Sequence, residues 1–198
     1  MRFDDASWRW QDPLGRDWSP AVRFSLPDLD VFRIDANAAV PVQTASWASV
    51  GTILFDLAVN PKSGRVYATN TEARNEVRFE GPGGFLGSST VRGHLHEARV
   101  TVLDGADVLP RRLNKHIDYS VVPSAPGTKQ RSLATPVGMA VSSDGERLWV
   151  AAFGSSKVGV FSTAELEADT FVPDEKAQVA VSSGGPTVLG LEIGRAHV

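Results

Sequence analysis

Two histidines and a glutamate lie close together in the stretch HLHEA, and their side chains are of the types that bind metal ions. His94 and His96 are two residues apart, so in an extended strand both side chains lie on one face. With Glu97 and His116 they would offer nitrogen and oxygen ligands, which predicts a possible metal site. The alternative is that these histidines are solvated or form hydrogen bonds at the rim of the fold.

A second cluster of polar side chains lies in the stretch NTEARNEVRFEG. Arginines at this spacing can bind carboxylates through paired hydrogen bonds, so the cluster predicts a binding surface for a small polar ligand or a protein partner. The alternative is a self-contained network of ion pairs that holds the loop onto the fold. The candidate residues are Glu72, Arg74, Asn75, Glu76 and Arg78.

Composition excludes several other kinds of chemistry. The chain has no cysteine, which rules out disulfides, thiolate nucleophiles and C-x-x-C-H haem attachment within these 198 residues. The net charge is −3, with lysines and arginines scattered, so nucleic acid is not an expected partner. No apolar run reaches the roughly 20 residues of a membrane span. We expect no cofactor in this stretch, while a metal ion or haem elsewhere in a longer chain stays possible.

A repeated pattern indicates the elements that position these residues. The stretches LFDLAVNPKSGRVYATN (54–70) and PVGMAVSSDGERLWVAA (136–152) align without a gap, and PTVLGL (186–191) begins a third copy. Each of the two full copies reads as an apolar strand, a turn with glycine, and a second strand. Alternating strands recur further along at 31–36, 100–105 and 158–163, and the blocks 108–119 and 171–181 are long enough for a fourth strand. Four-stranded antiparallel units in tandem predict an all-β fold, an incomplete β-propeller with about two full blades and parts of two others.

The spacing between copies predicts where long loops lie. Leu54 and Pro136 are 82 residues apart, whereas Pro136 and Pro186 are 50 apart, against about 40–50 for common blade repeats. The excess divides between the second-to-third-strand connection and the link to the next unit. These two connections emerge at the same end of an antiparallel meander. Because long loops are often functional, this loop-bearing rim is the predicted working surface.

Aromatic residues recur in the pattern. Tyr67 and Trp149 occupy equivalent positions and are predicted to pack between sheets. Trp8, Trp10 and Trp18 cluster near the start of the chain, where core packing and a docking surface are both open interpretations.

The two blocks LAVNPKSGRVYATN and MAVSSDGERLWVAAFGSSKVGVFST resemble the YVTN-type β-propeller repeat family, over roughly residues 30–191. The stretches TEARNEVRFEG, HLHEARVTVLDG and LNKHIDY are similar to segments of exported bacterial propeller proteins, some of which carry c-type cytochrome segments. The resemblance implies a periplasmic or extracellular protein.

The resulting organisation is a partial propeller over 1–191. Residues 1–36 are expected to end one blade, 51–120 to form a blade with the long loop, 134–182 to form another, and 185–191 to begin the next. Residues 192–198, EIGRAHV, resemble a translated sequencing adapter and are predicted to be a non-native tail.

Two functions fit this sequence. The first is a binding or scaffold propeller that presents the loop-bearing rim to a ligand, a partner or an electron-transfer module. The alternative is a propeller enzyme, either a metal-dependent lactonase-like hydrolase or an oxidoreductase, with Asn70 near its site.

Overall fold

The structure is a computed structural model that describes residues 2–4, 6–7, 9–21, 29–74, 94–121, 123–174 and 178–180. Three of the predicted site residues, Asn75, Glu76 and Arg78, lie outside the described residues, as do the strand expected at 186–191 and the tail at 192–198.

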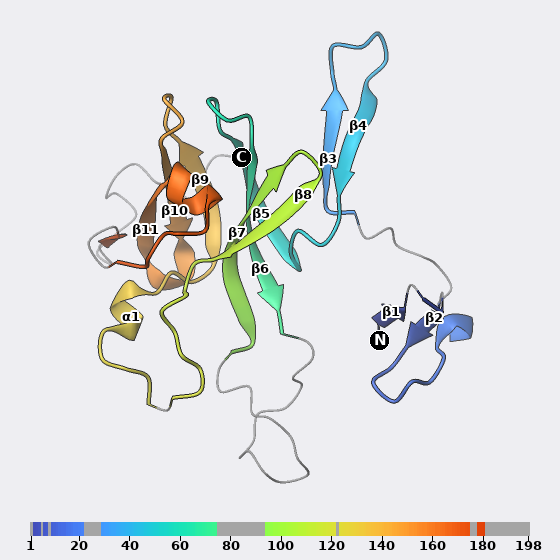
Figure 1. The fold of residues 1–198 in the computed structure, drawn as a ribbon, viewed down its shortest axis with the longest axis horizontal. Coiled ribbons are helices and arrows are strands. Elements are labelled where there is room, and N and C mark those ends of the chain that lie inside the picture. Colours follow the sequence, from blue (N-terminus) through green and yellow to red (C-terminus); the bar gives the residue numbers. More distant parts are fainter. Residues whose placement is uncertain are drawn as a thin grey trace, which may run out of the picture.

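Antiparallel strands dominate the described chain (Figure 1). The strands are β1 (Arg2–Asp4), β2 (Arg9–Gln11), β3 (Val31–Asp35), β4 (Val42–Trp47), β5 (Ile53–Val59), β6 (Val66–Ala73), β7 (His96–Asp104), β8 (Asp107–Arg112), β9 (Pro136–Val141), β10 (Arg147–Ala152), β11 (Lys157–Ser162) and β12 (Gln178–Ala180). The helices are short: η1 (Ser19–Ala21), α1 (Thr128–Arg131), η3 (Phe153–Ser155) and α2 (Thr163–Glu167). The predicted all-β class with antiparallel sheets is confirmed. None of the described helices is long and apolar enough to cross a membrane.

Two of the sheets have four strands in sequential order. One runs β5-β6-β7-β8 and the other β9-β10-β11-β12, while β1-β2 and β3-β4 form two-stranded sheets. The gapless alignment of the two copies is matched by their strand register. Val59 pairs with Val66 in the first sheet, and Val141 pairs with Leu148 at the equivalent positions of the second. Closure of these sheets into a propeller stays a prediction.

A hydrophobic core joins the two four-stranded sheets. Alternation along β6 and β10 turns Tyr67, Leu148 and Val150 into this core, where all three are fully buried. Val100 and Val102 of β7 extend it. The four-stranded sheets therefore pack face to face.

The other face of β5–β8 packs on the β3-β4 hairpin. Val31 and Trp47 meet Ala68 and Leu103 in a second, smaller cluster. The indole nitrogen of Trp47 donates a hydrogen bond to the carbonyl oxygen of Gly105, at 3.0 Å. The β5–β8 sheet is therefore covered on both faces, although the hairpin covers one face only in part.

One local expectation differs from the structure. The strand predicted at 158–163 ends at Ser162 in the structure, because α2 begins at Thr163. The hydroxyl of Ser162 caps this helix by accepting a hydrogen bond from the backbone N–H of Glu165. The helix buries Leu166 in the core and directs Glu167 toward the first sheet.

Candidate functional site

The two long connections meet on one rim. The β6–β7 connection includes His94 and the β8–β9 connection includes Tyr119, and their rings stack with centroids 3.7 Å apart and planes 4° from parallel. This contact joins two loops that are separated by a complete β-hairpin in the sequence. The rim predicted from loop lengths thus has both loops in contact within the described residues.

Arg74, Glu97 and Arg112 surround the stacked pair. Nη1 of Arg74 lies 3.1 Å from Nδ1 of His94, and Nε2 of His94 lies 3.1 Å from a carboxylate oxygen of Glu97. Nε of Arg112 lies 3.2 Å from the same oxygen of Glu97, and Nη1 of Arg74 lies 3.7 Å from it. We call these four side chains, with Tyr119, the rim cluster.

The rim cluster combines two guanidinium groups, one carboxylate and two uncharged rings. Burial, with the nearby charge of Arg74, lowers the pKa of His94, so the imidazole is neutral at neutral pH. Burial also raises the pKa of Tyr119, whose hydroxyl stays protonated. The guanidinium groups of Arg74 and Arg112 both face the carboxylate of Glu97. Arg112 carries the more accessible of the two, because its side chain is 45% exposed.

The remaining predicted residues lie elsewhere. Glu72 of β6 pairs with Arg99 of β7, at 2.8 Å. Arg99 also donates to the amide oxygen of Asn70, at 3.1 Å, and to the carbonyl oxygen of Val50. Asn70 is fully buried, donates to Thr101, and has its polar atoms satisfied in this network. These contacts indicate a structural role for Asn70.

The four candidate metal ligands do not converge. His94 precedes β7, while His96 begins the strand, is exposed and pairs with Ala73, so the two do not share a strand face. His116 instead faces the α1 turn, where its Nε2 lies 3.0 Å from the carbonyl oxygen of Thr128. Within the described residues, no three His, Cys, Asp or Glu side chains are placed to hold a metal ion. Only His94 and Glu97 of the predicted set meet.

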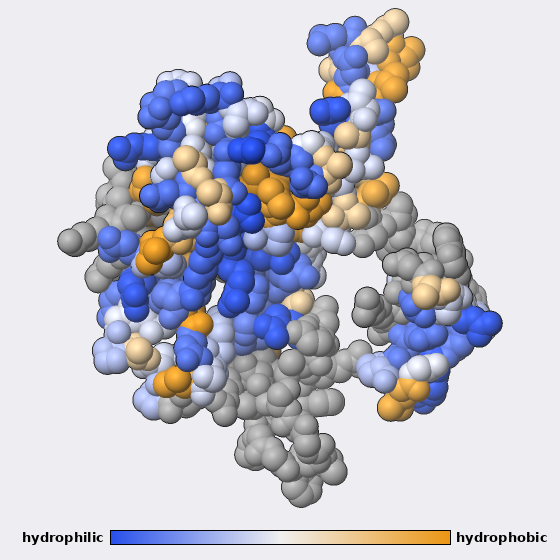
Figure 2. All heavy atoms as spheres, in the orientation of Figure 1, coloured by the Kyte–Doolittle hydropathy of each residue, from blue (hydrophilic) through white to orange (hydrophobic). Residues whose placement is uncertain are grey.

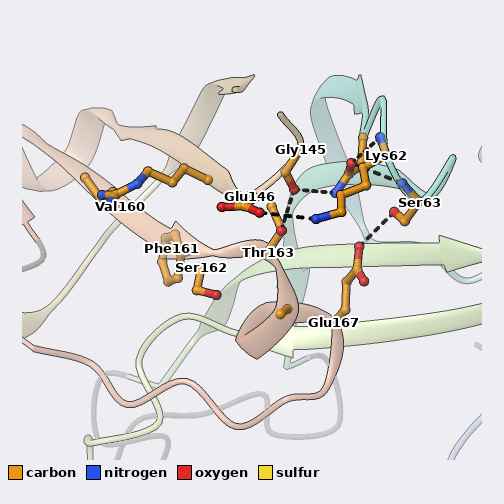
Figure 3. A pocket seen from close by; sticks show the side chains of 12 residues that line it. Lys62, Ser63, Gly145, Glu146, Val160, Phe161, Ser162, Thr163 and Glu167 are labelled. Carbon is orange, nitrogen blue, oxygen red and sulfur yellow. Dashed lines mark hydrogen bonds and ion pairs between the residues drawn. The ribbon is translucent and has the colours of Figure 1, made fainter. Parts of the chain in front are cut away.

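A cleft on the opposite rim was not foreseen from the sequence (Figure 3). It has a volume of about 870 Å³ and lies where the β5-β6 turn meets the β9-β10 turn and α2. The side chain of Asn60 donates to the carbonyl oxygen of Gly145, at 2.9 Å, and to the hydroxyl of Tyr67, at 2.8 Å. Tyr67 in turn donates to Glu167, at 2.6 Å. Burial raises the pKa of Tyr67 to about 12, so this hydroxyl remains a donor.

Ion pairs complete the walls of this cleft. Arg65 bridges Asp104 of β7, at 2.7 Å, and Glu167 of α2, which follows β11 of the second sheet. Lys62 reaches Glu146 across the same boundary, at 3.2 Å. Because the polar groups are engaged with one another, the cleft is best described as a junction that fixes the two sheets. The sequence signal for it was the repeated turn, whose two copies prove to be in contact.

Comparison with known proteins gives little guidance. The chain matches no protein-family model and no curated protein. Among solved structures it is similar to Kuenenia stuttgartiensis hydrazine synthase, with 14% sequence identity and a TM-score of 0.42. The similar region covers 72% of this chain and 39% of that one. A TM-score this low does not establish a common fold, so the proposals below rest on the residues of this chain.

Proposed function

We propose that this chain is part of a propeller-type scaffold that binds an anionic partner through its loop-bearing rim. The observation that carries the proposal is the His94–Tyr119 stack, since it joins both long loops into one surface. Consecutive four-stranded sheets packed face to face support the propeller part of the proposal. Placement outside the cytoplasm belongs to the same proposal and rests on the family resemblance.

The exposed guanidinium of Arg112 favours a carboxylate-bearing partner, such as an acidic protein segment. Glu97 occupies one side of the two arginines, and the exposed guanidinium of Arg112 retains donors for a second carboxylate. The stacked rings are held from both loops and form a fixed base beside it. A rigid base lowers the entropic cost of binding. The neutral His94 and protonated Tyr119 add no negative charge that would repel the ligand.

The test is a titration with a peptide of alternating Asp and Ser residues, followed by isothermal calorimetry at low and high salt. We expect binding that salt weakens, and an Arg112→Gln variant that binds about tenfold more weakly, because one charge-assisted hydrogen bond contributes about 1.5 kcal/mol. The melting temperature should barely change, because an exposed ion pair contributes about 1 kcal/mol or less.

Arg147→Gln is the matched control, since Arg147 is also exposed but lies at the opposite rim. Its peptide affinity should equal that of the unaltered protein. An equal loss in both variants would show only a general charge effect, and absence of binding by the unaltered protein would remove the proposal.

A further inference from the structure

The N-terminal unit, which comprises β1, β2 and η1, contains a turn with the same pattern of hydrogen bonds as the β5-β6 turn. The backbone N–H of Asp12 donates to the carbonyl oxygen of Arg16, at 3.2 Å, and that of Gly15 donates to Asp12, at 2.9 Å. At the β5-β6 turn, Asn60 donates to Arg65 and Gly64 donates to Asn60, both at 2.9 Å. Gly15 and Gly64 have φ of +76° and +72°, in the left-handed region that favours glycine.

The side chains of the two turns also correspond. Oδ1 of Asp12 accepts from the backbone N–H of Leu14, at 2.9 Å, and Oδ1 of Asn60 accepts from that of Lys62, at 2.8 Å. Asp12 accepts from the indole nitrogen of Trp18, at 3.0 Å, whereas Asn60 donates to the hydroxyl of Tyr67, at 2.8 Å.

The flanking strands correspond as well. Gln11 pairs antiparallel with Asp17, as Val59 pairs with Val66. Residues 9–17 therefore carry the first strand of a repeat unit, a turn one residue shorter, and a bridge residue where the second strand would begin, and η1 follows at 19–21.

The β3-β4 hairpin has fewer described strands than the two larger sheets, and the N-terminal unit could supply the other two. Among the described residues the hairpin comprises two strands, β3 and β4, whereas each of the two larger sheets has four. By sequence pattern, β3 and β4 correspond to the third and fourth strands of a repeat. Within the part of the chain that the structure describes, no first or second strand of that repeat is paired with β3.

An apolar surface is exposed where those strands would lie. Leu57 pairs with Ala68 and Val59 with Val66, which places both on the face of β5–β8 that the hairpin covers in part. Leu57 is 51% and Val59 60% exposed. Phe32 and Ile34 of β3 are also exposed, and Figure 2 shows apolar side chains along the projecting hairpin.

The opposite face of β5 shows how such a surface is covered. There β9, the first strand of the next sheet, packs on β5, and the backbone N–H of Met139 donates to Asp56, at 2.9 Å. The equivalent first strand on the hairpin side would be β2.

We propose that residues 9–21 dock between β3 and β5, completing a four-stranded sheet with β3 and β4 and covering Leu57 and Val59. Figure 1 shows the N-terminal unit apart from the hairpin, so docking brings two separated parts of the chain together. The nine residues between 21 and 31 can span about 30 Å when extended, which allows this approach. Docking rests on the repeat pattern and is independent of ligand binding at the rim.

The repeat also predicts the register of docking. Val66 of β6 faces Leu103 of β7. Asp17 is equivalent to Val66, and Ile34 is equivalent to Leu103 in the aligned strands. Asp17 should therefore lie directly opposite Ile34.

Because the chain has no cysteine, a disulfide tests this register directly. We would oxidise the double variant Asp17→Cys and Ile34→Cys, count free thiols by mass spectrometry, and separate the products by non-reducing electrophoresis. Docking predicts loss of both thiols in a monomer. The matched control pairs Asp17→Cys with Phe32→Cys, because diagonal neighbours lie about 7–8 Å apart, beyond the Cβ separation of about 3.5–4.5 Å that a disulfide requires.

Each outcome decides the proposal. An intrachain disulfide in the first variant but not in the control supports docking, and adding Leu57→Asp should lower its yield by removing the apolar contact. A disulfide between chains would show that a second copy occupies the site, which overturns docking within one chain. Two persistent free thiols, or equal crosslinking in both variants, would also overturn it.

Discussion

Tyr67 and Trp149 occupy the same position in the two four-stranded sheets, yet their surroundings differ. Tyr67 is 0% exposed, lies between the sheets, and exchanges hydrogen bonds with Asn60 and Glu167. Trp149 pairs with Ala140 as Tyr67 pairs with Ala58, but it is 36% exposed. The β9–β12 sheet covers Tyr67, whereas Trp149 points to the far face of that second sheet.

This difference shows that a repeat position acquires its role from the next sheet. An aromatic residue at this position contributes most when a neighbouring sheet supplies both apolar contacts and polar partners. The same reasoning applies to Leu57 and Val59, which occupy a face that is covered in part.

Truncation of the two aromatic residues should give the largest contrast. Tyr67→Ala should destabilise the protein by about 3–5 kcal/mol, because it leaves a core cavity, while Trp149→Ala should cost about 1 kcal/mol or less, in line with a surface substitution. Urea unfolding followed by circular dichroism measures both. Similar losses for the two variants would mean that Trp149 is also covered in solution, as it would be by a further sheet.

The turn glycines offer a second, smaller contrast. Gly64 and Gly145 both have φ of +72°, but a Cβ on Gly145 would lie 2.4 Å from Oδ1 of Asn60, whereas one on Gly64 meets nothing within 4 Å. Alanine at either position should cost about 1–2 kcal/mol for the left-handed conformation. Gly145→Ala should lose a further amount of about 1–3 kcal/mol from overpacking.

Asn60→Ala provides the control for this contrast, because it removes the oxygen that the new methyl group would strike. In that background the two alanine variants should become more alike in their unfolding free energies. If Gly64→Ala were the more damaging substitution, the turn contact would not be the cause.

The histidines of the long loops should make the stability of the protein depend on pH. We expect this effect to be smaller than those of the aromatic and glycine substitutions. Burial lowers the pKa of both His94 and His116 relative to their ordinary value of 6.5. The unfolded chain therefore binds more protons as the pH falls below about 6.5, so stability decreases there and levels off below the folded-state pKa values. His94→Gln should reduce this loss, measured as unfolding free energy at pH 7.5 and 5.5. An unchanged slope in the variant would assign the loss to other groups.

Much of the local structure was predictable from alternation and turn residues. The two aligned copies appear as β5-β6 and β9-β10 with matching register, because period-two patterning and a glycine-containing turn are local properties. The turn at Asp12–Arg16 escaped notice because it is one residue shorter and its strands carry fewer aliphatic residues. Its hydrogen bonds revealed the relation.

The candidate site was only partly predictable. Loop lengths indicated the rim on which both long loops meet, and His94, Glu97 and Arg74 were identified from their types. Tyr119 and Arg112 were missed, since nothing in the local sequence says that they approach His94. The predicted metal set failed because His94 lies outside the strand that carries His96.

The sequence by itself determined the strands, their turns and which side chains share a face, since these follow from backbone geometry over a few residues. Only the tertiary structure decided which faces are covered. Asn60 and Gly145 are 85 residues apart in the chain, and Arg65 and Glu167 are 102 apart, yet the first pair joins the turns of two sheets and the second joins the first sheet to α2. Such contacts depend on how whole sheets pack, so the same position holds a buried tyrosine in one sheet and an exposed tryptophan in the other.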